Sequence, residues 1–126
     1  MKKNILGFIT SGIWISLSEF VRNELVLKTY WLGKYKSLGL VFPADSINNA
    51  LWGLWSFMLA GVIVFLFRKL RFFETIVISW IMAFCMMWVV IGNLNVLPVK
   101  LLLFAVPWSF LEVTIAALLC KRFNAD

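Results

Sequence analysis

Residues 47–67 read INNALWGLWSFMLAGVIVFLF, a run that contains no charged side chain. An α-helix of about 20 predominantly apolar residues is long enough to cross the hydrocarbon core of a bilayer. A soluble domain of this size leaves much of its surface in water, so it could not bury such a run completely. The segment therefore predicts a transmembrane helix.

Three further apolar segments surround this run. One precedes it, at residues of about 5–27, and two follow it, at about 73–92 and about 98–120. Four spans of roughly 20 residues leave little chain for a soluble domain. The sequence thus predicts an all-α integral membrane protein, a bundle of four transmembrane helices that forms a single membrane domain over residues 1–126.

The composition excludes the other broad classes of protein. Hydrophobic residues make up 63% of the chain, charged residues make up 14%, and the mean hydropathy is +0.94. Soluble domains average about 45–50% apolar and about 25% charged residues. A soluble enzyme, a disordered chain and a disulfide-rich secreted domain are therefore excluded.

The residues needed for most cofactor and catalytic chemistry are missing. The chain has no histidine, which excludes histidine-ligated haem or zinc and catalytic triads built on histidine. Cys85 and Cys120 lie in or beside apolar runs and are expected to be buried packing residues. We expect no cofactor, no metal site and no catalytic residue. A small lipid-modifying enzyme that uses carboxylates is the enzymatic alternative.

The connection between the first and second spans, residues 25–46, is aromatic and basic rather than simply polar. Tyr30, Trp31 and Tyr35 alternate there with lysines and aliphatic residues. Such a mixture is typical of a segment that lies at the membrane interface, with aromatic rings at the level of the lipid headgroups. Asp45 and Ser46 are expected to cap the second helix.

The basic residues predict the orientation. With four spans both chain ends lie on one side of the membrane, and that side carries seven of the lysines and arginines: Lys2, Lys3, Arg68, Lys69, Arg71, Lys121 and Arg122. The opposite side carries five: Arg22, Lys28, Lys34, Lys36 and Lys100. The bias predicts cytoplasmic termini and a place in the plasma (inner) membrane. These flanking residues also account for the net charge of +6, so we expect contact with membrane lipids and no nucleic-acid partner.

Each predicted span carries a stripe of small or polar residues at helical spacing, the pattern that close helix packing in lipid requires. The stripes are Gly12, Ser16, Glu19 and Asn23; Asn49, Gly53, Ser56 and Ala60; Ser79, Ala83, Met86, Val90 and Asn93; and Ala105, Ser109, Glu112 and Ala116. They predict that two intramembrane carboxylates, Glu19 and Glu112, face the interior of the bundle. Ionisable side chains in a membrane are costly and tend to be functional.

These carboxylates and the polar helix ends define a predicted solute or ion pathway with an outward-facing vestibule. Its residues are Glu19, Arg22, Asn23, Asn49, Asn93, Lys100 and Glu112. From the helical rise we expect Glu19 and Glu112 to lie about 10 Å apart along the membrane normal, as two steps of one path. Pro107 is expected to kink the fourth helix and to free the carbonyl of Leu103.

Two functions fit this pattern. One is an oligomeric transporter or channel for a small solute or ion. The chain would then act as a homodimer or larger homo-oligomer, because four helices seldom enclose a complete pathway alone. The alternative is a structural or accessory subunit that binds a partner membrane protein and uses its buried polar residues to hold helices together.

Overall fold

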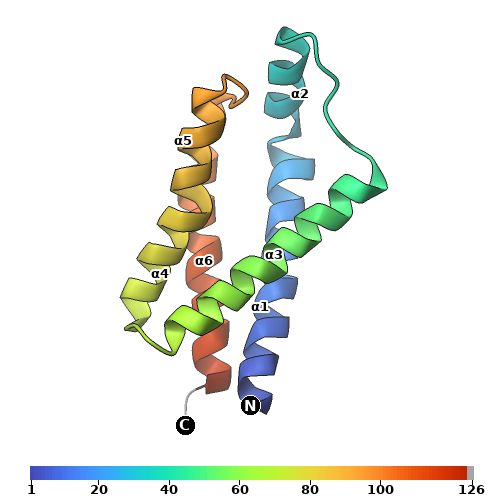
Figure 1. Cartoon of the computed structure of the whole chain (residues 1–126). Helices are drawn as coiled ribbons and strands as arrows, with labels where there is room; N and C mark the ends of the chain where they lie inside the picture. The colour runs from blue at the N-terminus through green and yellow to red at the C-terminus, as the bar shows by residue number, and fades with distance from the viewer. Residues whose placement is uncertain (125–126) are drawn as a thin grey trace.

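The computed structural model describes residues 1–124, and its regular elements are helices (Figure 1). Four of its helical segments are long and apolar enough to cross a membrane: Lys2–Val26, Ser46–Phe67, Phe72–Asn93 and Val99–Phe123. They coincide closely with the four predicted spans, and the predicted fold class is therefore confirmed. A shorter helix connects the first span to the second.

The first span is a composite helix. It starts with α1 (Lys2–Phe20), continues in a π-helical segment η1 (Val21–Val26), and is followed by the short helix α2 (Lys28–Ser37). In Figure 1, α2 extends the line of α1 beyond the other helices. The backbone N–H of Leu27 donates to the carbonyl of Arg22 at 2.7 Å, a five-residue spacing that marks the wider π turn. Both residues are buried.

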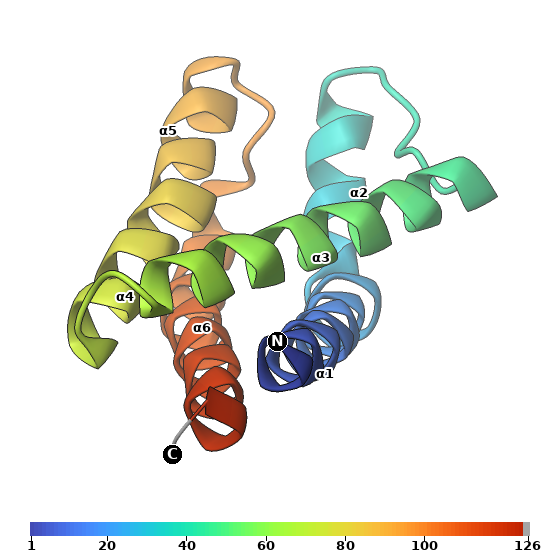
Figure 2. The same cartoon turned by 60° about the horizontal axis from the view of Figure 1, so that its bottom comes forward.

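The second span is α3 (Ser46–Phe67). Asp45 is its N-cap, as expected, and the side-chain carbonyl of Asn48 accepts a hydrogen bond from the Asp45 backbone N–H at 3.1 Å. Asp45 and Asn48 together form a capping box. It gives hydrogen-bond partners to backbone N–H groups that would otherwise lack them at the start of the helix. α3 crosses the bundle obliquely, over α1, as the two views in Figures 1 and 2 agree.

The third and fourth spans form the rest of the bundle. The third consists of α4 (Phe72–Trp80), the π-helical segment η2 (Ile81–Cys85) and α5 (Met86–Asn93). The fourth begins with a short 3-10 turn η3 (Val99–Leu101) and continues as α6 (Leu102–Asn124). α6 lies beside α1, and the start of α1 and the end of α6 are at the same end of the bundle (Figure 2).

Small residues bring the helices close together. Ala60, Ala116 and Ala117 are fully buried in the main apolar core. A Cβ atom placed on Gly12 would overlap the ring of Phe57, so α1 and α3 depend on the glycine for their close approach. Large apolar side chains such as Leu103 lie on the outside instead. This is the arrangement expected when lipid, rather than water, surrounds a bundle.

The predicted stripes are confirmed in part. All four residues of the α6 stripe, from Ala105 to Ala116, are buried. In the third stripe Ala83 packs against the core, but the stripe is wrong from Met86 onward, because Met86 is exposed and its neighbours Met87 and Trp88 pack against the core instead. The π turn of η2 adds one residue to the helical repeat, so a different set of residues faces the core after it. The exposed members of the predicted stripes are Asn49, Met86, Val90 and Asn93.

Candidate functional site

Three ionisable side chains meet between the first and last spans: Glu19 of α1, Arg22 of η1 and Glu112 of α6. The Nη2 atom of Arg22 donates a hydrogen bond to Oε1 of Glu19, and its Nη1 atom lies 3.8 Å from Oε1 of Glu112. All three side chains are at most 5% exposed. We call this set the charge cluster.

The local structure explains why the cluster forms there. Arg22 lies three residues after Glu19, a spacing that puts both side chains on the same, inward face of the helix. The small residues Ser109 and Ala116 keep the facing side of α6 clear around Glu112. The Arg22 guanidinium also lies over the Phe84 ring of η2, 5.3 Å from its centroid, so the cation has aromatic as well as anionic neighbours.

The geometry corrects one sequence-based expectation. Glu19 and Glu112 were expected to be separate steps about 10 Å apart, from the helical rise alone. One guanidinium instead contacts both carboxylates. The helical rise describes positions along the membrane normal and does not reveal a side-chain contact between two helices.

The cluster is incompletely satisfied. Nη1 of Arg22 and both carboxylate oxygens of Glu112 are buried and lack a hydrogen-bond partner in the part of the chain described. Two ionised carboxylates beside one guanidinium would carry one negative charge in excess. Because uncompensated charge is costly in a membrane, the arrangement favours uptake of one proton or one other cation at Glu112.

A pocket of about 240 Å³, lined by both polar and apolar side chains, adjoins the cluster at Glu19. The Asn23 side-chain amide donates to Oε2 of Glu19 at 3.0 Å, and Trp31 donates to the Asn23 side-chain carbonyl at 3.3 Å. The pocket lies between α1, η1 and α3, and we call it the vestibule pocket. Its lining residues are Ser16, Glu19, Phe20, Asn23, Glu24, Asn49, Trp52, Gly53 and Ser56.

The remaining predicted pathway residues lie elsewhere. Asn93 is exposed at the C-terminal end of α5. Lys100 is exposed in η3 and lines a different hollow, together with Tyr30 and Lys34 of α2. Pro107 lies inside α6, where it has no N–H to donate to the carbonyl of Leu103. Contacts or a common pocket therefore connect Glu19, Arg22, Asn23, Asn49 and Glu112, but not Asn93 or Lys100.

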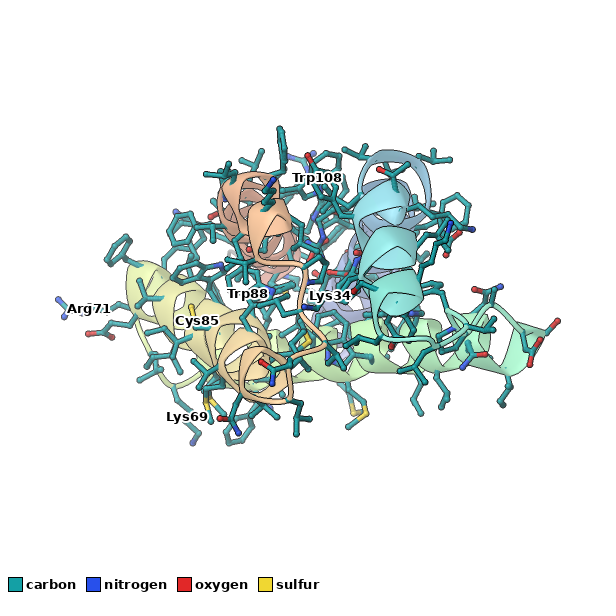
Figure 3. All side chains as sticks on the ribbon, turned by 90° about the horizontal axis from the view of Figure 1, so that it is seen from above. Lys34, Lys69, Arg71, Cys85, Trp88 and Trp108 are labelled. Atoms are coloured by element: carbon teal, nitrogen blue, oxygen red, sulfur yellow. The ribbon has the colours of Figure 1, made fainter. Side chains whose placement is uncertain are left out.

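A second cavity lies on the other side of α1 and touches Glu112. It has a volume of about 610 Å³ and runs between α1, η1 and α6. We call it the α1–α6 groove, and its lining residues are Trp14, Leu17, Ser18, Val21, Leu103, Phe104, Pro107, Trp108, Leu111 and Glu112. Figure 3 shows Trp108 between the ribbons of α6 and α1, on the face away from α3.

Sequence reasoning missed the tryptophans and the serine of this groove. Trp108 donates to the Ser18 hydroxyl at 3.0 Å, and Trp14 donates to the backbone carbonyl of Glu112 at 2.9 Å. Aromatic belts at the membrane interface are the usual explanation for tryptophans in a membrane protein. The sequence did contain a sign that Trp14 and Trp108 are different. Both lie near the middle of their spans, too far from either end to belong to an interfacial belt.

Comparisons with known proteins add no family to this picture. No protein-family model, no curated protein and no solved structure matches the chain. Across the described residues, no group of three or more Cys, Asp or Glu side chains could hold a metal ion. The functional conclusion therefore depends on the charge cluster and its two adjoining cavities.

Proposed function

We propose that the protein is a membrane transporter or channel for a small cation, with the proton as the simplest case. The observation that carries this proposal is the contact of Arg22 with both Glu19 and Glu112, which leaves one carboxylate without a balancing charge inside the membrane. A buried group of this kind favours cation binding, because its charge must be compensated in a medium of low polarity.

The two cavities beside the charge cluster support a route for the cation. Glu19 lines the vestibule pocket, whose amides and carboxylates are suited to hydrated cations. Glu112 lies near the middle of the fourth span and lines the α1–α6 groove. In the proposed route a proton passes from the vestibule pocket to Glu19, crosses the cluster beside Arg22, and reaches Glu112.

The proposal includes an oligomer in the plasma membrane with both termini in the cytoplasm. Many large apolar side chains face outward, and such a surface suits contact with lipid or with a second copy. A second copy would enclose the groove side of the bundle, which a single set of four helices leaves open. The basic turn at Arg68–Arg71 and the basic chain ends favour the cytoplasmic orientation.

Proton flux into liposomes tests the proposal. The full-length chain is reconstituted with a trapped pH-sensitive dye, and a potassium gradient with valinomycin imposes the membrane potential. Wild type should acidify the lumen faster than protein-free liposomes, and Glu112→Gln should abolish that flux. Glu74→Gln is the matched control, because Glu74 pairs with the exposed Arg71 at the opposite end of the bundle from α2.

A wild-type chain that carries neither protons nor sodium or potassium ions, under either sign of potential, would overturn the proposal. A structural or accessory subunit would then be the better function. One observation favours this second candidate: hydrogen bonds across α1 and α6 flank the cluster, from Trp14 to the Glu112 carbonyl and from the Ser11 hydroxyl to the Ala116 carbonyl at 3.0 Å. In that case Glu112→Gln should lower the unfolding temperature of a chain that transports nothing.

A further inference from the structure

We infer that the α1–α6 groove binds a lipophilic amine, with its apolar body between the two helices and its ammonium group at Glu112. This inference goes beyond the proposed function, because it assigns to Glu112 a ligand of another class, which reaches the charge cluster from the lipid side. The groove volume of about 610 Å³ falls within the range of about 300–1,000 Å³ that is usual for small-molecule sites.

The lining of the groove selects an apolar ligand with one polar end. Leu17, Leu103 and Leu111 contribute aliphatic surface from both helices, and Ser18 and Glu112 are its polar residues. Trp14 and Trp108 also line it. Tryptophan rings favour cations as well as apolar groups, so the aromatic lining is compatible with a charged end that enters beside them.

The buried carboxylate specifies the polar end. Glu112 is 1% exposed, and neither of its carboxylate oxygens has a hydrogen-bond partner among the described residues. An ammonium group brings up to three donors and one positive charge. It would satisfy those oxygens and balance the excess negative charge of the cluster. A fatty acid or another anion would meet repulsion there, and a simple acyl chain would leave the carboxylate unsatisfied.

The groove is reached from the lipid side. Leu17, Leu103 and Leu111 are each more than half exposed in the isolated bundle, so a ligand dissolved in the membrane could enter between α1 and α6 without passing through the vestibule pocket. Figure 3 places Trp108 at this open side, away from the crossing helix α3. The groove and the vestibule pocket therefore approach the charge cluster from different sides of α1.

Binding of dansylcadaverine to the purified full-length chain tests the inference. This probe has an aromatic body and a primary amine, and its directly excited emission rises and shifts to the blue in an apolar site. The dansyl amide of pentylamine has the same body without the amine. We expect saturable binding of the amine probe by wild type, at least about tenfold tighter than binding of the neutral analogue.

Two variants and one matched control locate the site. Glu112→Gln should weaken binding of the amine probe to the level of the neutral analogue. Leu17→Trp should fill the groove and weaken both probes. Ile13→Trp is the control, because Ile13 is similarly exposed on α1, one turn earlier, but does not line the groove. If Glu112→Gln fails to fold, Leu17→Trp and the paired probes still decide the result.

The outcomes separate this inference from the proposed function. Equal affinity of wild type for the amine and neutral probes would overturn the inference and identify the groove as an acyl-chain site. Unchanged binding in Leu17→Trp would also overturn it, by placing the probe elsewhere. Amine binding without proton flux in liposomes would refute transport and leave the site standing. Proton flux without amine binding would refute the amine site and leave the transport proposal standing.

Discussion

Nη1 of Arg22 lies 3.8 Å from Oε1 of Glu112, so one ion pair joins the first span to the last. The two residues are far apart in the sequence, and each belongs to a different helix. Their contact turns two isolated intramembrane charges into one cluster with Glu19. Cation transport through the cluster and amine binding at Glu112 both depend on this contact.

Removing the cation should damage the fold more than removing one anion. Arg22→Gln leaves two buried carboxylates without their common partner, and breaking a buried pair in this way costs roughly 3–5 kcal/mol. Glu112→Gln leaves Arg22 paired with Glu19 and should cost less. Unfolding of the detergent-solubilised chain by sodium dodecyl sulfate, followed by circular dichroism, measures the difference. The reverse order of stabilities would show that Arg22 does not hold the carboxylates together.

The double variant Arg22→Gln with Glu112→Gln provides the internal control for this prediction. If the two side chains interact as the 3.8 Å contact indicates, the double variant should be more stable than the sum of the single changes predicts. Strict additivity would contradict the contact. Arg71→Gln should leave stability unchanged, because that arginine is 87% exposed in its pair with Glu74 and surface pairs contribute little.

Gly12→Leu should destabilise the α1–α3 contact. Any Cβ at this position overlaps the Phe57 ring, and overpacking of this kind costs about 1–3 kcal/mol. The same unfolding assay measures the loss. Phe57→Ala in the Gly12→Leu background should restore part of the stability. Gly53→Ala is the control, since nothing lies within 4 Å of a Cβ at that position of α3.

Asn23→Ala should lower proton flux in the liposome assay by several-fold, whereas Asn93→Ala should leave it unchanged. The Asn23 amide holds Oε2 of Glu19 at 3.0 Å and lines the vestibule pocket. Asn93 is exposed at the end of α5. Equal proton flux in the Asn23→Ala and Asn93→Ala variants would show that the vestibule pocket is not part of the pathway.

Cysteine labelling should place α2 and the turn between α3 and α4 on opposite sides of the membrane. Ser37→Cys at the end of α2 should react with a membrane-impermeant maleimide in intact cells, and Lys69→Cys should react only after permeabilisation. Both substitutions are made in a Cys85→Ser background, since Cys85 is the more accessible of the native cysteines. Labelling of Lys69→Cys in intact cells would reverse the predicted orientation.

Periodicity identified the inward face well in α6 and poorly in the third span, which contains a π turn. In α6 the repeat of small and polar residues identified the inward face from Ala105 to Ala116 correctly. In the third span the prediction was wrong from Met86 onward, directly after the π-helical segment η2. A π turn leaves no clear mark in the sequence, because it changes backbone hydrogen bonding rather than composition.

The site was predictable as a set of unusual residues but not as a contact. Glu19 and Glu112 were identifiable because ionisable residues are rare inside spans. The contact of Arg22 with Glu112 depends on the close approach of the first span and α6, which the sequence does not reveal. The α1–α6 groove was not predictable, because its two sides come from opposite ends of the chain.

By itself, the sequence determined the four spans, the helical class and the candidate buried carboxylates. These follow from length, hydropathy and charge, which are properties of continuous segments and of the membrane as solvent. Only the tertiary structure decided which charges meet, which helix faces point inward and where the cavities lie. Those features depend on how separate helices pack, and in lipid that packing follows from side-chain shape and hydrogen bonding rather than from hydrophobicity.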